Sequence, residues 1–142
     1  MYTQKINRSD PDKAFTAVLS AYATADLTVG QAVCYAGNGT NDGIAVTRPA
    51  TALNIGLFAG IVTGTIANGS YGTAQCWGYN STALISGSTD VAVGNKLATK
   101  DGVFNLIKEG GTVVPGESGL CVALEAYTTT AAAAKKVWIR AM

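Results

Sequence analysis

The sequence predicts an all-β protein: a single compact β-barrel or jelly-roll-like sandwich with an extended N-terminal arm. Three observations predict this class. The 142 residues match one domain with a core of its own. Seventeen glycines and many short apolar segments divide the chain at frequent intervals, as turns between strands do. One segment alternates with period two, which is typical of a strand and not of a helix.

The alternating segment lies within Ile66–Tyr79 and is predicted to be the central strand. Asn68-Gly69 precedes it, a pair that favours tight hairpin turns. One side of the strand is bulky and the other nearly flat: the first carries Tyr71, Thr73, Gln75, Trp77 and Tyr79, the second Gly72, Ala74, Cys76 and Gly78. The flat side allows another layer to approach closely, and the large rings suit a core that opens onto an interface.

The N-terminal residues 1–12 are polar and end at Asp10-Pro11-Asp12, which predicts an arm ahead of one β domain over residues 13–142. Such an arm is either frayed or becomes ordered on a partner. The next segment, Lys13–Tyr22, fits helical spacing and also alternates as a strand does. We interpret it as a strand, because the segments that follow it are all β.

The first half of the chain contains three further predicted strands, at Leu27–Tyr35, Ile44–Thr47 and the apolar run Asn54–Val62. The last is apolar on both faces, as expected of a fully buried strand. Leu27–Val33 reads LTVGQAV and Val91–Leu97 reads VAVGNKL, an echo that predicts two similar corners of a barrel without a repeat array.

The second half begins with a short predicted strand at Ala83–Ile85. Lys100-Asp101-Gly102 then predicts a hairpin between strands at 96–99 and 103–107. Another strand is expected at Leu120–Tyr127. Thr128–Ala134 is interpreted as a linker of small residues, and Val137–Arg140 as the closing strand.

The residue types give little support to catalysis. The chain has no histidine, which removes Ser-His-Asp and Cys-His pairs and most zinc sites. The nine acidic residues fall mostly in apparent turns, and their spacing suggests no catalytic pair. The glycine-rich loop 37–43 lacks both the lysine of a phosphate-binding loop and the acids of a calcium loop. We therefore expect no enzyme, no metal and no cofactor.

The cysteines, Cys34, Cys76 and Cys121, each lie in an apolar segment and are interpreted as buried small hydrophobes. A disulfide or a metal site is the alternative for these residues.

The charge is low for a soluble protein. Only 13% of the residues are charged, and the formal net charge is +1, so we expect a surface that packs against other copies or a larger assembly. No basic cluster predicts a nucleic-acid partner, and no apolar run is long enough to predict a membrane span. Because the first residues lack the apolar core of a signal peptide, we expect folding in the cytosol.

Five sequence blocks carry a resemblance to a known family. They read DPDKAF, TADLTVGQAV, DGIAVTRPA, IANGSYGTAQCWGYNS and KKVWIRAM, in that order along the chain. This pattern resembles the small β-rich decoration, or cement, proteins of tailed bacteriophage heads. The resemblance implies a β-barrel or jelly-roll-like domain that binds the outside of a major-capsid-protein shell, commonly as dimers or trimers. It implies no catalytic residue.

The first functional hypothesis is therefore a non-enzymatic capsid decoration protein, made in the host cytoplasm and located on the virion exterior. Its partners would be the major capsid protein and its own copies, as a homodimer or homotrimer. The arm is the candidate strap, and the candidate interface residues are Tyr2, Ile6, Arg8, Tyr71, Trp77, Tyr79 and Trp138.

The second hypothesis is a carbohydrate-binding or receptor-binding module on the virion surface, using Trp77, Tyr79 or Tyr127. The third is an enzyme, which the missing histidine and scattered acids oppose.

Overall fold

The computed structural model describes the chain except residues 1–12, 37–42, 51–56, 87–89, 111–120 and 142. The described residues form nine strands and no helix, which confirms the all-β prediction. The strands are β1 (Ala14–Ser20), β2 (Ala32–Tyr35), β3 (Ala45–Thr47), β4 (Phe58–Val62), β5 (Tyr71–Ile85), β6 (Lys96–Thr99), β7 (Leu106–Lys108), β8 (Cys121–Ala123) and β9 (Ala133–Arg140). No helix in this part of the chain is long and apolar enough to cross a membrane.

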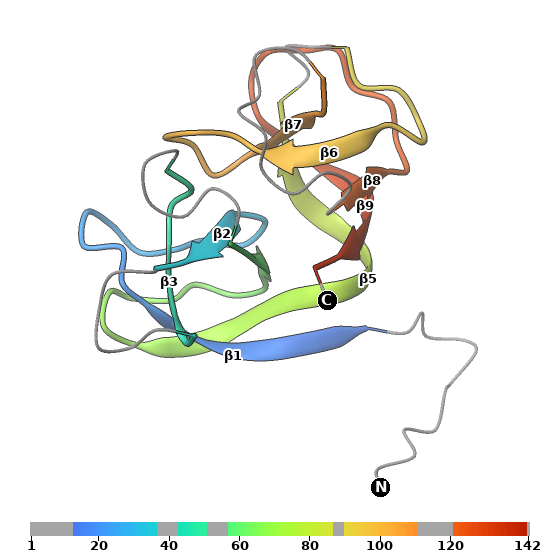
Figure 1. The fold of residues 1–142 in the computed structure, drawn as a ribbon. Helices are drawn as coiled ribbons and strands as arrows, with labels where there is room; N and C mark the ends of the chain where they lie inside the picture. The colour runs from blue at the N-terminus through green and yellow to red at the C-terminus, as the bar shows by residue number, and fades with distance from the viewer. Residues whose placement is uncertain (1–12, 37–42, 51–56, 87–89, 111–120, 142) are drawn as a thin grey trace, which may run out of the picture.

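The nine strands form one sheet in the order β1-β3-β2-β4-β5-β7-β6-β8-β9. Two additional pairings, β1 with β5 and β5 with β9, each bring a strand back to β5. The sheet therefore closes twice, into two five-stranded barrels that share β5. In Figure 1 the strands β1 to β3 occupy the lower part of the molecule, β6 to β9 the upper part, and β5 runs through both.

The two barrels have the same connectivity. The first runs β1-β3-β2-β4-β5 and the second β5-β7-β6-β8-β9, so each strand of the first has a counterpart four places later. Parallel pairs also match, β1 with β3 and β5 with β7. We call the two halves the first repeat (β1 to β4 with the N-terminal part of β5) and the second repeat (the C-terminal part of β5 with β6 to β9).

The turn that leads into β2 is repeated before β6. In the first, Thr28 N donates to Gln31 Oε1 at 2.9 Å. In the second, Ala92 N donates to Asn95 Oδ1 at 2.8 Å. The same local hydrogen bond therefore fixes both turns, and the predicted similarity of these corners is confirmed.

The residue before each turn makes an equivalent bridge. Leu27 bridges Ile66 in the first repeat, and Val91 bridges Tyr127 in the second. The sequence similarity between Leu27–Val33 and Val91–Leu97 thus belongs to an internal structural repeat that extends over the described fold.

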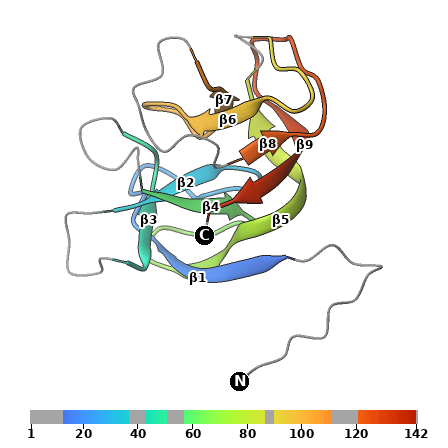
Figure 2. The same cartoon turned by 45° about the vertical axis from the view of Figure 1, so that its right-hand side comes forward.

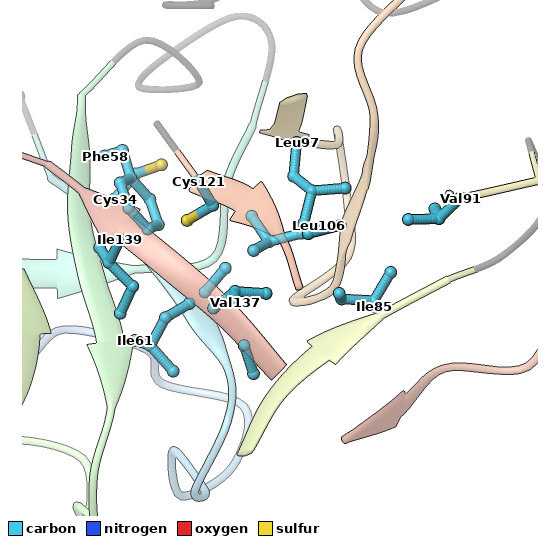
Figure 3. Packing of buried hydrophobic residues seen from close by; sticks show 13 residues of the cluster. Cys34, Phe58, Ile61, Ile85, Val91, Leu97, Leu106, Cys121, Val137 and Ile139 are labelled. Carbon is cyan, nitrogen blue, oxygen red and sulfur yellow. The ribbon is translucent and has the colours of Figure 1, made fainter. Parts of the chain in front are cut away.

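Matched positions of the two repeats are buried in two hydrophobic clusters. The pairs, with the first-repeat residue given first, are Leu27 and Val91, Val33 and Leu97, Val46 and Leu106, Val62 and Ala123, and Ala74 and Val137. The cluster of the second repeat also takes in the outer sides of β2 and β4, whose Cys34, Phe58 and Ile61 pack toward Cys121 and Ile139 (Figure 3). Apolar burial therefore holds the two barrels together as well as filling each.

The central strand β5 differs from the prediction in two ways. It continues through Ala83–Ile85, which was expected to be a separate short strand, because a bulge between Asn80 and Ala83 keeps the pairing with β9. In addition, the flat side faces the cores: Ala74 and Gly78 are buried, while the aromatic side faces outward. The rings were expected to line a core that opens onto an interface; small residues are buried there because the two barrels leave little space along β5.

Other strand boundaries also differ from the predicted ones. Ala133 and Ala134 were assigned to a linker but pair with β5 as the start of β9. The hairpin after β6 forms as predicted, yet its second strand begins at Leu106, because residues 103–105 belong to the connecting loop. The strand choice for the segment after the arm is confirmed by β1, and β4 is buried throughout as expected. The arm, residues 1–12, lies outside the described residues.

Candidate binding surface

Three of the predicted interface residues lie together on the outer side of the second barrel. Tyr79 of β5 stands opposite Trp138 of β9, and Trp77 stands opposite Arg140. The rings of Trp77 and Trp138 meet edge to face, with centroids 6.3 Å apart and an interplanar angle of 77°. All three aromatic side chains are half-buried. We call Trp77, Tyr79 and Trp138 the aromatic cluster; it combines a fixed apolar surface with polar ring edges that can reach a partner.

The strand beneath the aromatic cluster is held by two buried amides. Gln75 Nε2 donates to the carbonyl oxygens of Trp77 at 2.9 Å and of Tyr79 at 2.8 Å. Asn80 Nδ2 donates to Gln75 Oε1 at 3.0 Å, and both amide side chains are buried. Gly78, with φ of +94°, supplies a conformation between the two aromatic residues that a side chain would oppose. These bonds position the cluster before any partner arrives.

Sequence reasoning did not assign this role to Gln75 and Asn80. The available signal was a pair of amides inside an otherwise apolar and aromatic strand, because a buried amide requires several hydrogen-bond partners.

Tyr71, another predicted interface residue, lies apart from the aromatic cluster. It begins β5, six residues before Trp77, which corresponds to about 20 Å along a strand. Its side chain is 70% exposed, and it stands opposite Leu19 of β1. Phe15 of β1, which was not predicted, is 55% exposed and stands opposite Gln75. Apolar side chains thus mark the outer face of β1 and β5 as well.

The remaining predicted residues, Tyr2, Ile6 and Arg8, lie outside the described residues. β1 begins at Ala14, which stands opposite Trp77 of the aromatic cluster.

Tyr127, which was considered for sugar stacking, already has partners. Its hydroxyl donates to Ala131 O at 2.6 Å, and Lys135 Nζ lies 4.8 Å from its ring centroid. Lys135 also forms an ion pair with Glu125 at 2.9 Å. The hydrogen bond from Lys135 holds the pKa of Glu125 below its usual range. One face of the ring is therefore occupied by the lysine.

The cysteines are buried thiols in the described structure, as the sequence predicted. Burial raises the pKa of Cys34 to about 12, although the Thr99 side chain opposes part of this effect. Burial also raises the pKa of Cys76 and of Cys121. A thiol that stays protonated is a poor nucleophile and a poor metal ligand. Within the described ranges, no group of three or more acidic or cysteine side chains has the arrangement of a metal site.

Comparison with solved structures shows a likeness in fold. No family model matches the chain. No curated protein matches it either. Among solved structures, the chain is similar to the crystal structure of the head fiber gp8.5 N base in bacteriophage phi29, with a TM-score of 0.51 and 10% sequence identity. The alignment covers 92% of this chain and 96% of that chain. The two chains therefore share an architecture over nearly all of the residues compared.

Proposed function

We propose that the protein is a structural component of a tailed-phage virion, which binds the outer surface of the major-capsid-protein shell as a homodimer or homotrimer and stabilises the mature head. It acts without catalysis, metal or cofactor. The observation that carries this proposal is the fold shared with the base of a phage head fiber, aligned over 96% of that base. The sequence blocks that resemble head decoration proteins support the same assignment independently.

The outer surface suits such a role. The aromatic cluster presents a preordered apolar area beside the exposed Arg140, and Phe15 and Tyr71 extend the apolar character along β1 and β5. Aromatic residues and arginine are enriched at protein interfaces. An oligomer that engages several capsid subunits gains avidity from individually modest contacts. Binding only the mature lattice stabilises that lattice by mass action.

Co-sedimentation with undecorated mature heads tests this function, with empty procapsids as the comparison. We expect saturable binding to mature heads alone. Trp138→Ala should weaken that binding, because it removes a ring from the aromatic cluster. Leu124→Ala is the matched control: it truncates an exposed apolar residue outside the cluster and should bind as the unaltered chain does. Absence of binding to either particle would contradict the proposal.

A carbohydrate-binding role is the second candidate. The half-buried rings of Trp77 and Tyr79 favour it, since sugars stack on aromatic faces that remain accessible. A glycan array, followed by titration of tryptophan fluorescence, separates this role from capsid binding. A saturable spectral change with a soluble glycan, lost in Trp77→Ala, would support it.

A further inference from the structure

A row of paired side chains leads from the aromatic cluster across the second barrel. Trp138 of β9 stands opposite Tyr79 on one side and opposite Val122 of β8 on the other, and Val122 stands opposite Lys96 of β6. Figure 2 shows β9 between β8 and β5. Paired residues share one face of a sheet, and the next residues along these strands are fully buried: Leu97, Cys121 and Ile139. The row therefore lies on the outer face of the barrel.

Basic side chains surround the aromatic cluster on this face. Lys136 and Arg140 lie on either side of Trp138 in alternate positions of β9, so they point to the same side as its ring. Both are exposed, as is Lys96. Strand geometry places Lys136 and Arg140 about 13 Å apart along β9, and Lys96 about 10 Å from Trp138 across two strands. We call Lys96, Lys136, Arg140 and the aromatic cluster together the cationic face.

The positive charge of the cationic face is not balanced by acids. The strands that form it, β5, β6, β8 and β9, contain no Asp or Glu. Their other cation, Lys135, belongs to the opposite side of β9 and pairs with Glu125. The acid beside Lys96 is Glu109, which follows β7 and whose N–H donates to Lys96 O at 2.8 Å. Three positive charges thus meet one negative charge at the edge, and the face keeps a positive potential.

The first repeat uses the equivalent positions differently. Its corresponding row is Ala32 of β2, Ile61 of β4 and Gln75 of β5, which have the same pairings. All three are buried, and Ile61 packs into the hydrophobic cluster of the second repeat. In the first repeat this face is therefore covered by the next barrel. In the second repeat it carries cations, which are costly to bury in an apolar joint of that kind, so the two faces suit different partners.

The arrangement of the cationic face favours an extended anionic polysaccharide. Gln75 and Asn80 fix the strand beneath the rings before a ligand arrives, and accessible aromatic faces can stack against sugar rings. The cations lie one or two strand positions away from the rings, where they can pair with acidic groups on neighbouring sugar units. A sheet face also suits a chain, whereas sites for single small molecules are concave.

Nucleic acid fits the cationic face less well. A DNA strand carries one phosphate per about 3.4 Å, so cations about 13 Å apart leave most phosphates unpaired. The formal net charge of the whole chain is only +1, which provides little general attraction for a dense polyanion. A polymer whose charges are separated by sugar rings matches the spacing better.

We propose that the cationic face binds an anionic polysaccharide, whose sugar rings stack on the aromatic cluster and whose acidic groups pair with Lys96, Lys136 and Arg140. This inference rests on the carbohydrate-binding role of the second candidate function, for which it gives the class of glycan. The rings accept neutral and acidic sugars alike, so the three cations are the residues that select an acidic glycan.

Polygalacturonate tests this inference, because each of its sugar units carries a carboxylate. Its methyl-esterified form has the same backbone without the charge and is the matched neutral ligand. Titration followed by tryptophan fluorescence should show saturable binding of polygalacturonate, with a dissociation constant about 10-fold lower than that of the ester, since three exposed ion pairs are gained. Equal affinity for the two polymers would overturn the inference.

Substitutions on the cationic face separate the two parts of the site. Combining Lys96→Gln, Lys136→Gln and Arg140→Gln should abolish the preference for the charged polymer, whereas Trp138→Ala should weaken the binding of both polymers about 10-fold. Lys100→Gln is the control: it changes an exposed lysine that follows β6 and should bind as the unaltered chain does. Circular dichroism checks that each variant is folded. Unchanged affinity in the combined variant would contradict the assignment.

Other polymers test the alternative occupants of this face. Poly-glutamate represents an acidic protein segment and oligothymidylate represents nucleic acid, and neither contains a pyranose ring. We expect both to bind more weakly than polygalacturonate at equal charge concentration, and equal or tighter binding of either would overturn the inference. A second copy on this face would give an oligomer in analytical ultracentrifugation that Trp138→Ala dissociates and polygalacturonate does not, which would also overturn it.

Co-sedimentation with heads in the absence of glycan distinguishes this inference from capsid binding. Polygalacturonate binding without binding to heads would sustain the inference and contradict the capsid role. Binding to heads without polygalacturonate binding would sustain the capsid role and contradict the inference.

Discussion

Gly30 and Gly94 hold matched positions in the two repeats but have different surroundings. Both adopt the left-handed region, with φ of +88° and +84°. A Cβ at Gly30 would overlap the Thr82 carbonyl, while a Cβ at Gly94 would meet nothing within 4 Å in the described structure. Both positions therefore require glycine for the left-handed backbone, but only Gly30 also lacks the space for a Cβ.

Alanine at each position should measure these two needs. Gly94→Ala should lower the free energy of unfolding by about 1–3 kcal/mol, the usual cost of a left-handed non-glycine residue. Gly30→Ala adds a clash with backbone, so we expect a loss of more than about 4 kcal/mol. Urea denaturation followed by circular dichroism measures both values, and equal losses would show that the Thr82 contact adds nothing.

The sequence allowed part of this contrast to be predicted. The shared pattern around the two glycines predicted similar turns, because turn chemistry is local. The contact of Gly30 with Thr82 was not predictable, since it depends on how two barrels meet.

Small residues on one side of the central strand β5 allow neighbouring segments to pack closely against it. Ile66 packs against Gly72 so closely that a Cβ there would overlap the Ile66 side chain. The flat face was expected to permit close approach, and it does. Its continuation through Ala83 could not be predicted, because Ser81 and Thr82 break the alternation and the bulge that accommodates them depends on β9.

A double-mutant cycle tests the fit of Ile66 to Gly72. Gly72→Ala should lower the free energy of unfolding by about 1–3 kcal/mol through overpacking. Ile66→Ala should lower it by about 2–5 kcal/mol through a cavity. The double variant should lose at least about 1 kcal/mol less than the two losses combined, because each change relieves the other. Strict additivity in urea denaturation would contradict this direct contact.

The shared strand makes the two barrels one cooperative unit. Residues 71–77 of β5 pair with β1 and residues 77–85 with β9, and Cys34, Phe58 and Ile61 of the first repeat pack into the cluster of the second, so we expect the two barrels to unfold together. The sequence predicted a barrel or a jelly-roll-like sandwich, but it could not show that the sheet closes twice, because both closures pair strands far apart in the chain. The aromatic cluster was likewise predictable only in part. The alternation of β5 predicted that Trp77 and Tyr79 share one side of a strand, whereas the position of Trp138 beside them depends on the pairing of β5 with β9.

Leu27→Ala tests this cooperativity. Leu27 is fully buried in the first barrel, and its truncation should lower the free energy of unfolding by about 2–5 kcal/mol. Trp138 lies on β9 of the second barrel, and Trp77 pairs with β9 and, through Ala14, with β1, so their fluorescence reports on the second repeat and on its junction with the first. We expect the fluorescence and circular-dichroism transitions to shift together. A fluorescence midpoint that stays in place while the circular-dichroism midpoint moves would show independent barrels.

Sharing β5 also determines how many strands a longer protein of this architecture would need. Two separate five-stranded barrels would need ten strands, and the described residues of this chain form nine. Each additional barrel therefore costs only four strands, and a chain extended by one more unit would have thirteen. The unit to add or to graft is thus a four-stranded block that begins inside one long shared strand and ends inside the next. Engineered fusions should therefore be joined within these shared strands and not in the loops between strands.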